Sequence, residues 1–229
     1  MDPSTDLNLL REVPIFSDLS ESEINVIVDM AVRRSFSKSS LIVLEESHAE
    51  TLYIIEFGSV KITRLNDEGR EVILAMLGTS EFFGEMALLD GQGRSANVMA
   101  LEDTQLLTLS RRDFLDVLHR FPSISIQLLK EMTGRLRKSD QHIKSLSLSD
   151  AEHRIGITLH RISEEMGIFR KGEVIIGKLP FQQDIANMAG TSRETVSRML
   201  KNLEAKGLLK REGRRLTIHD YAAFTRLFG

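Results

Sequence analysis

The chain has 229 residues, a net charge of −3 at pH 7 and no cysteine. This length suits two modest domains, and the lack of cysteine excludes disulfides, iron–sulfur clusters and thiolate metal sites on this chain. No apolar run approaches the roughly 20 residues of a membrane span, and the polar, acidic start is unlike a signal peptide. We therefore expect a cytoplasmic protein with no membrane partner.

The charge is unevenly distributed along the chain. Residues 1–50 contain ten acidic and four basic residues, whereas residues 192–215 contain eight basic and three acidic ones. Because salt limits the reach of distant charges to about 8 Å, a local basic patch is enough to bind nucleic-acid phosphates. The six histidines are scattered and predict no metal site. No nucleophile–base pattern appears, so we expect no enzyme.

The N-terminal half is predicted to be a sheet domain. Ser20 followed by Glu23 is a capping box that predicts an early helix. From about residue 36 to 109, short strands alternate with turns; within residues 60–77, two strands flank the turn sequence Asn-Asp-Glu-Gly. Several such strands at even spacing favour a sandwich or jelly roll.

A segment inside this sheet region carries candidate phosphate-binding groups. Gly84 lets the backbone approach a ligand, and a one-turn helix from Glu85 would aim free N–H groups at an anion. Arg94 offers a planar fork to a phosphate, and Ser95 adds a hydroxyl donor. Glu85 would repel a phosphate and is better placed to accept from a sugar hydroxyl. On these residues alone, a surface salt bridge between Glu85 and Arg94 is the alternative.

The middle of the chain is predicted to be helical. Ser110 with Asp113 starts a helix running to about His119. A longer helix follows, with a narrow seam spaced at 3 and 4 residues: Leu129, Met132, Leu136, Ser139, Ile143 and Leu146. Such a seam favours a parallel homodimer, because a helix that packs only on its own domain usually has a wider apolar stripe. Ser149 with Glu152 predicts a new helix, which makes residues 146–149 a hinge.

Two helices joined by a glycine turn are expected near the C-terminus. The first has a short amphipathic pattern made by Phe181, Ile185, Ala186 and Met188. After Gly190, Thr191 with Glu194 is a capping box that predicts a helix starting at Ser192. Its buried stripe is expected to comprise Val196, Met199, Leu200 and Leu203. This arrangement places the second helix in a DNA groove.

The exposed face of that second helix has side chains that read base edges. Arg193 and Arg198 can bond bidentately to guanine, and Glu194 can accept from the cytosine amino group. Gly207 is expected to end the helix. Apolar residues then flank a basic run at 210–215, which predicts a hairpin with a basic tip, a wing. A solvated charged helix and turn is the alternative.

Two of these segments resemble one protein family. Residues 83–96 resemble the phosphate-binding cassette of cyclic-nucleotide-binding domains, and residues 192–198 resemble the recognition helix of the bacterial cyclic AMP receptor protein/fumarate-nitrate reductase regulator (CRP/FNR) family. The resemblance implies an α+β fold. Its expected parts are a cyclic-nucleotide-binding β-roll (jelly roll) at 1–121, a dimerisation helix at 122–148 and a winged helix-turn-helix DNA-binding domain at 149–229.

The resemblance also implies the residues that contact each partner. The ligand-binding residues are Gly84, Glu85, Met86, Arg94, Ser95, Ala96, Arg135, Ser139 and Asp140. The DNA-binding residues are Gln182, Gln183, Ser192, Arg193, Glu194, Ser197, Arg198, Lys201 and Arg214. The chain departs from the family at Ser39-Ser40 and Glu46-Ser47, where the family has glycines, at Gly93, where proline is common, and at Gln182, where arginine is common.

Asp140 is the departure that bears on the effector. A carboxylate only accepts hydrogen bonds, so it suits the adenine 6-amino group or the N1 and 2-amino donors of guanine. The resemblance puts cyclic AMP first, with cyclic GMP as the rival. The third interpretation is that Asp140 simply pairs with Arg137 or Lys144.

The resemblance implies a homodimeric transcription regulator that is controlled by a cyclic nucleotide and needs no other cofactor. Its partners would be a pseudo-palindromic duplex with TGTGA-like half-sites and RNA polymerase. Alternatives are a regulator with another effector, constitutive DNA binding, and a nucleotide-regulated subunit of an enzyme. The last would not need a basic helix-turn-helix.

Overall fold

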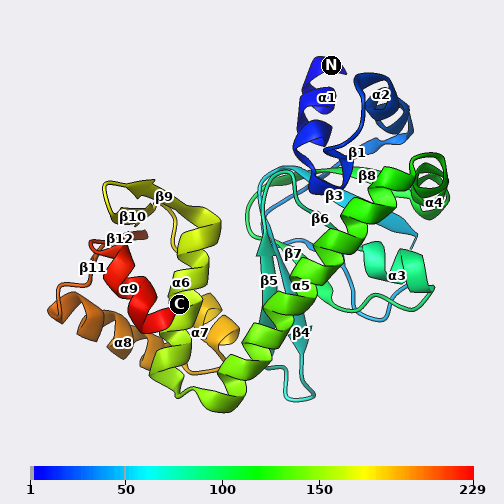
Figure 1. Cartoon of the computed structure of the whole chain (residues 1–229). Helices are drawn as coiled ribbons and strands as arrows, with labels where there is room; N and C mark the ends of the chain where they lie inside the picture. The colour runs from blue at the N-terminus through cyan, green and yellow to red at the C-terminus, as the bar shows by residue number, and fades with distance from the viewer. Residues whose placement is uncertain (1–2, 49) are drawn as a thin grey trace. The chain divides into compact units, whose positions relative to one another are not determined.

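The computed structural model describes residues 3–48 and 50–229 (Figure 1). The chain forms two compact units, Met1–Arg137 and Lys138–Gly229. The first unit holds α1 (Pro3–Glu12), η1 (Pro14–Phe16), α2 (Glu21–Met30), β1 (Val32–Phe36), β2 (Leu41–Val43), β3 (Thr51–Phe57), β4 (Val60–Leu65), β5 (Glu71–Leu77), β6 (Phe82–Phe83), α3 (Glu85–Asp90), β7 (Asn97–Ala100), β8 (Thr104–Ser110) and α4 (Arg111–Arg120). Helix α5 (Pro122–Leu148) begins in the first unit and ends in the second.

The strands of the first unit form two antiparallel four-stranded sheets, in the orders β1-β8-β3-β6 and β2-β7-β4-β5. A buried apolar cluster draws on both sheets, through Val43, Ile55, Val60, Leu77, Phe83, Val98 and Leu106. Side chains alternate along β3, so Leu52 and Ile54 join a second cluster with the surrounding helices, while Ile55 joins the first. The predicted jelly roll is confirmed.

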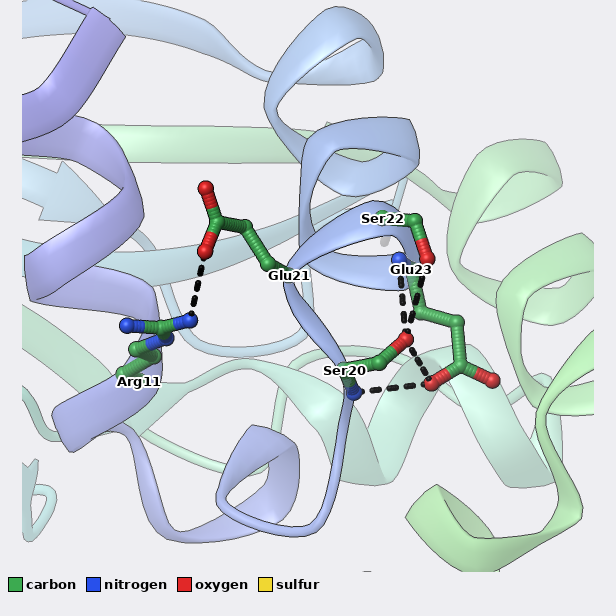
Figure 2. Close-up of polar contacts among 5 residues, drawn as sticks. All are labelled: Arg11, Ser20, Glu21, Ser22 and Glu23. Atoms are coloured by element: carbon green, nitrogen blue, oxygen red, sulfur yellow. Dashed lines mark hydrogen bonds and ion pairs between the residues drawn. The ribbon is translucent and has the colours of Figure 1, made fainter.

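The predicted caps of the N-terminal half are present. Figure 2 shows the capping box of α2, in which the Ser20 backbone N–H donates to Glu23 Oε2 at 2.8 Å and the Glu23 N–H donates to Ser20 Oγ at 3.4 Å. Arg11 of α1 also pairs with Glu21 at 3.1 Å, which ties the two helices together. Helix α4 is capped by Ser110, whose hydroxyl accepts from the Asp113 N–H. Asn66 Oδ1 accepts two backbone N–H groups in the turn predicted between β4 and β5.

The second unit is a winged helix-turn-helix. Its elements after α5 are α6 (Ala151–Met166), β9 (Gly167–Arg170), β10 (Glu173–Ile176), α7 (Gln182–Ala189), α8 (Arg193–Ala205), β11 (Leu209–Glu212), β12 (Arg215–Ile218) and α9 (Tyr221–Phe228). The strands form one antiparallel sheet in the order β11-β12-β10-β9. Gly207, with φ of +69°, follows α8 as predicted, and the hairpin turns at Gly213.

Two predicted caps were wrong by one residue. Helix α6 is capped by Asp150, which accepts from the His153 N–H at 2.8 Å, and not by Ser149, whose N–H continues the last turn of α5. Helix α8 is capped by Ser192 and begins at Arg193, because the Thr191 N–H is used to close the end of α7.

Two predictions about apolar stripes also need correction. Phe181 is the residue before α7 and is 56% exposed, so it is no part of that helix's buried face. Met132, predicted in the seam of α5, packs against the core of the first unit, whereas Leu136 and Ile143 are exposed. Within the described ranges, no helix is long and apolar enough to cross a bilayer.

Candidate functional site

The loop between β6 and α3 brings the backbone close to a buried arginine. Gly84 lies there with φ of +89°, a conformation that glycine adopts at no steric cost. A Cβ at this position would lie 2.5 Å from Arg94 Nη1 and 3.1 Å from the Thr51 carbonyl oxygen. Only glycine fits this close approach, as the sequence predicted.

Arg94 is 5% exposed and is held by neutral groups. Its Nη1 donates to the Gly84 carbonyl at 2.8 Å and its Nη2 to the Thr51 carbonyl at 2.6 Å. The guanidinium lies 5.6 Å from the Tyr53 ring, which stacks on Phe83. Burial lowers the pKa of Arg94, with Tyr53 acting in the opposite direction, but an arginine stays charged. No carboxylate of the described residues pairs with this buried charge. A bound anion would therefore offset the desolvation cost of burying the guanidinium.

Glu85 lies in the same pocket and keeps one oxygen free. The residue is 2% exposed, and its Oε1 accepts from Arg135 Nη1 at 3.0 Å. Arg135 also donates to the Phe82 carbonyl at 2.8 Å and lies 4.7 Å from the Phe82 ring. Glu85 Oε2 is buried and has no hydrogen-bond partner among residues 3–48 and 50–229, so it is an acceptor that a ligand hydroxyl would satisfy. The alternative salt bridge between Glu85 and Arg94 is not formed.

The structure therefore brings together four of the predicted ligand residues: Gly84, Glu85, Arg94 and Arg135. Ser95 is exposed beside Met86, with 3.9 Å between its Oγ and the methionine sulfur, and Ala96 is buried. Ser139 and Asp140 are exposed on the part of α5 that belongs to the second unit. Sequence reasoning missed Thr51 and Tyr53, because only the pairing of β3 with β6 places them at the pocket.

Helix α8 separates a buried face from an exposed polar one. Val196, Met199, Leu200 and Leu203 are buried, as predicted. The opposite face forms a hollow of about 480 Å³ lined by Gln182, Arg193, Glu194, Ser197, Arg198, Lys201 and Asn202. A hydrogen bond to its own backbone and one from Ser192 lower the pKa of Glu194, so Glu194 is an ionised acceptor between cationic neighbours.

Not every predicted DNA-binding residue is free on this surface. Gln183 donates to Asn187 at 2.9 Å. Arg214 donates through Nε and Nη2 to the Leu179 carbonyl, at 2.9 and 2.8 Å, and its guanidinium lies 4.3 Å from the Phe181 ring. These contacts fasten the wing to the start of α7. Sequence reasoning missed Asn202, which completes the polar face of α8.

Other charges predicted at the basic tip are also paired. Arg211 donates to Glu204 at the end of α8, through Nε at 3.0 Å and Nη2 at 2.5 Å. Lys210 pairs with Glu212 at 2.7 Å. Arg215 is exposed, without a hydrogen bond or ion pair to any described residue. Several of the cationic side chains of the hairpin are therefore already engaged within the fold.

A jelly roll with a buried arginine that no described carboxylate pairs with, and a winged helix with a cationic exposed face, are the features of a DNA-binding regulator with a sensory domain. The model of the cyclic nucleotide-binding domain matches residues 33–121, and that of the Crp-like helix-turn-helix domain matches residues 128–227. The chain is 36% identical over 204 residues to the cyclic AMP receptor protein of Thermus thermophilus, covering 88% of this chain and 90% of that one. It is 34% identical over 184 residues to the cAMP-activated global transcriptional regulator CRP of Salmonella typhimurium, covering 80% and 87%.

Solved structures agree with these matches. The structure of FixK2 from Bradyrhizobium japonicum has a TM-score of 0.78 at 24% identity, covering 87% of this chain and 98% of that one. The Thermus thermophilus catabolite activator protein has a TM-score of 0.55 at 31% identity, covering 93% and 97%. The chain belongs to the CRP/FNR family of DNA-binding transcription regulators. The relatives are regulators, which confirms the prediction that this chain is not an enzyme.

Proposed function

We propose that this regulator is controlled by a cyclic nucleotide bound at Glu85 and Arg94, with cyclic AMP the first candidate and cyclic GMP the rival. Two groups carry the proposal: a buried guanidinium that no described carboxylate pairs with, and beside it a buried carboxylate oxygen that accepts from no described donor. The cyclic phosphate would satisfy Arg94, and the ribose hydroxyl would satisfy Glu85. Gly84, Met86, Ser95 and Ala96 would form the walls of the same pocket.

Calorimetric titration of the full-length chain with cyclic AMP and cyclic GMP tests this proposal. We expect saturable binding of at least one nucleotide, lost in Arg94→Leu and kept in Arg112→Leu, an exposed arginine outside the pocket. An unchanged affinity in Arg94→Leu would defeat the pocket. Binding of neither nucleotide by the unaltered chain would favour another effector or constitutive DNA binding.

We extend the proposal to the base of the nucleotide, on the family resemblance alone. Ser139 and Asp140 would contact the purine, with Arg135 supporting the ligand through Glu85. Because a carboxylate only accepts hydrogen bonds, Asp140→Asn would change the ratio of the cyclic AMP and cyclic GMP affinities. An unchanged ratio would assign Asp140 to a pairing role outside the ligand site.

For DNA, we propose base contacts from Arg193, Glu194 and Arg198 and phosphate contacts from the surrounding residues. The latter are Gln182, Gln183, Ser192, Ser197, Lys201 and Arg214. The half-sites would resemble TGTGA facing TCACA, about one helical turn apart. Glu194→Ala should relax base preference at one position of each half-site, as measured by competition with single-base variants. Uniform weakening over all sequences would mean that Glu194 does not select bases, and Glu173→Ala in β10 is the matched control.

We also propose that the chain forms a homodimer through residues 122–148. This segment would join a nucleotide-binding domain at 1–121 to a DNA-binding domain at 149–229. RNA polymerase would be a further partner, in the cytoplasm. The exposure of Leu136 and Ile143 on α5 supports the interface. Sedimentation of Ile143→Glu should show monomers where the unaltered chain shows dimers. An unchanged dimer would place the interface elsewhere.

A further inference from the structure

A second, larger cavity lies within the Lys138–Gly229 unit. It has a volume of about 720 Å³ and is enclosed mainly by the last turns of α5 and by α6. This volume is in the range of small-molecule sites. None of the residues that line it also lines the hollow on α8, so the cavity is separate from the surface proposed to read DNA.

The basic side chains that line this cavity outnumber the acidic ones: Lys138, Lys144, Arg154 and Arg161 against Glu164 and Glu165. Of its acidic residues, Glu165 already accepts from Lys138 at 3.2 Å, and Glu164 lies 3.8 Å from Nδ1 of His160. Arg161 is half-buried at the same wall, with no hydrogen bond or ion pair to any residue in the described ranges. A half-buried cation without a counter-charge is costly, which favours an anion as the occupant.

A second arginine of α6 is fixed in place at the cavity wall. Arg154 donates to the carbonyls of Ala189 at 2.8 Å, Ser149 at 2.8 Å and Gly190 at 3.0 Å. These carbonyls end α5 and α7, and the helix dipole favours a cation at such ends. Because carbonyl groups carry no full charge, they do not neutralise Arg154, and its positive charge still acts on the cavity.

His142 of α5 lies within the electrostatic field of both arginines. The ring lines the cavity, half-buried. Burial lowers its pKa, and Arg161 and Arg154 lower it further. Ser145, one turn on, is a buried residue that lines the same cavity and has a hydroxyl group. Cationic, imidazole and hydroxyl groups thus line one side of the same cavity.

We propose that this cavity binds the phosphate group of a small molecule, through Arg161 with His142 and Ser145, in the field of Arg154. A guanidinium fork matches a phosphate in shape and charge. The group is supplied either by free phosphate or by a nucleotide. The site is independent of the jelly-roll pocket and shares no residue with it.

Titration of the full-length chain with inorganic phosphate, against chloride at equal ionic strength, tests the proposal. The His142 ring resonance in NMR is the local readout, because an anion beside it opposes the two arginines and raises its pKa. We expect a saturable shift, kept in Arg94→Leu because the jelly-roll pocket is not involved. Arg161→Gln should weaken phosphate binding about tenfold or more.

Two further variants and one further probe make the test specific. Arg170→Gln removes an exposed arginine of the same unit outside the cavity and should leave the shift unchanged, whereas Lys144→Gln at the rim should weaken binding to a smaller extent. Tighter binding of AMP than of phosphate would identify a nucleotide, and equal binding would identify phosphate itself. Absence of a saturable shift, or the same affinity in Arg161→Gln, would overturn the site.

Discussion

Removing the Glu85 carboxylate should abolish discrimination at the ribose of a bound cyclic nucleotide. A 3′,5′-cyclic nucleotide has one free ribose hydroxyl, at the 2′ position, and Glu85 Oε2 is a buried acceptor without a partner in the part of the chain that the structure describes. A hydrogen bond to a charged group contributes about 1.5–3 kcal/mol, which corresponds to about 10- to 150-fold in Kd. The unaltered chain should therefore prefer cyclic AMP to 2′-deoxy cyclic AMP by that factor.

The assay is calorimetric titration of both nucleotides into the full-length chain and Glu85→Ala. In Glu85→Ala the ratio of the two dissociation constants should fall to about one. The variant should fold, because Arg135 is 34% exposed at its side chain and can turn to water when Glu85 is lost. Glu68→Ala, an exposed carboxylate paired with Arg70, should keep the original ratio. If Glu85→Ala discriminates as well as the unaltered chain, the carboxylate does not bind the hydroxyl.

Three stability predictions follow from local geometry. Glu46 has φ of +63°, so Glu46→Gly should raise the free energy of unfolding in urea by about 1 kcal/mol; a decrease would mean that its side chain stabilises the turn. A Cβ on Gly156 would lie 2.1 Å from a Phe228 ring carbon, so Gly156→Ala should cost about 1–3 kcal/mol in the same assay, and a lack of any recovery with Phe228→Ala would contradict that contact. Arg211 lowers the pKa of Glu204, so this pair stabilises the fold fully above the unfolded pKa of about 4.3, and the stabilisation is lost as pH falls through the folded pKa. In Glu204→Gln the free energy of unfolding should therefore fall less steeply on acidification. The same dependence on pH in the variant and the unaltered chain would contradict this role of the pair.

The sequence predicts a helix start correctly where one residue is the obvious cap, and misplaces it by one residue where two neighbouring residues could both serve as the cap. At the start of α8, Thr191 with Glu194 matches a capping box, but Ser192 one residue later is an equally good cap. The left-handed turn at Gly190 decides between them, because it uses the Thr191 N–H to close α7. Asp150 displaces the predicted cap of α6 in the same way.

The candidate site was only partly predictable, for reasons of register and pairing. Gly84, Glu85 and Arg94 lie in one segment and could be chosen by chemistry, but Tyr53 enters only through the pairing of β3 with β6. In the wing, composition indicates a cationic tip, yet Arg214 is engaged by the Leu179 carbonyl. A list of charges does not reveal which of them are already paired within the fold.

Control of DNA binding by a cyclic nucleotide is tested most directly by the affinity of the full-length chain for a TGTGA–TCACA duplex, measured by fluorescence anisotropy with and without cyclic AMP or cyclic GMP. We expect tighter binding with at least one of the nucleotides, and loss of that increase in Arg94→Leu while its nucleotide-free DNA affinity is retained. The same affinity with and without both nucleotides would contradict control of DNA binding through the jelly-roll pocket.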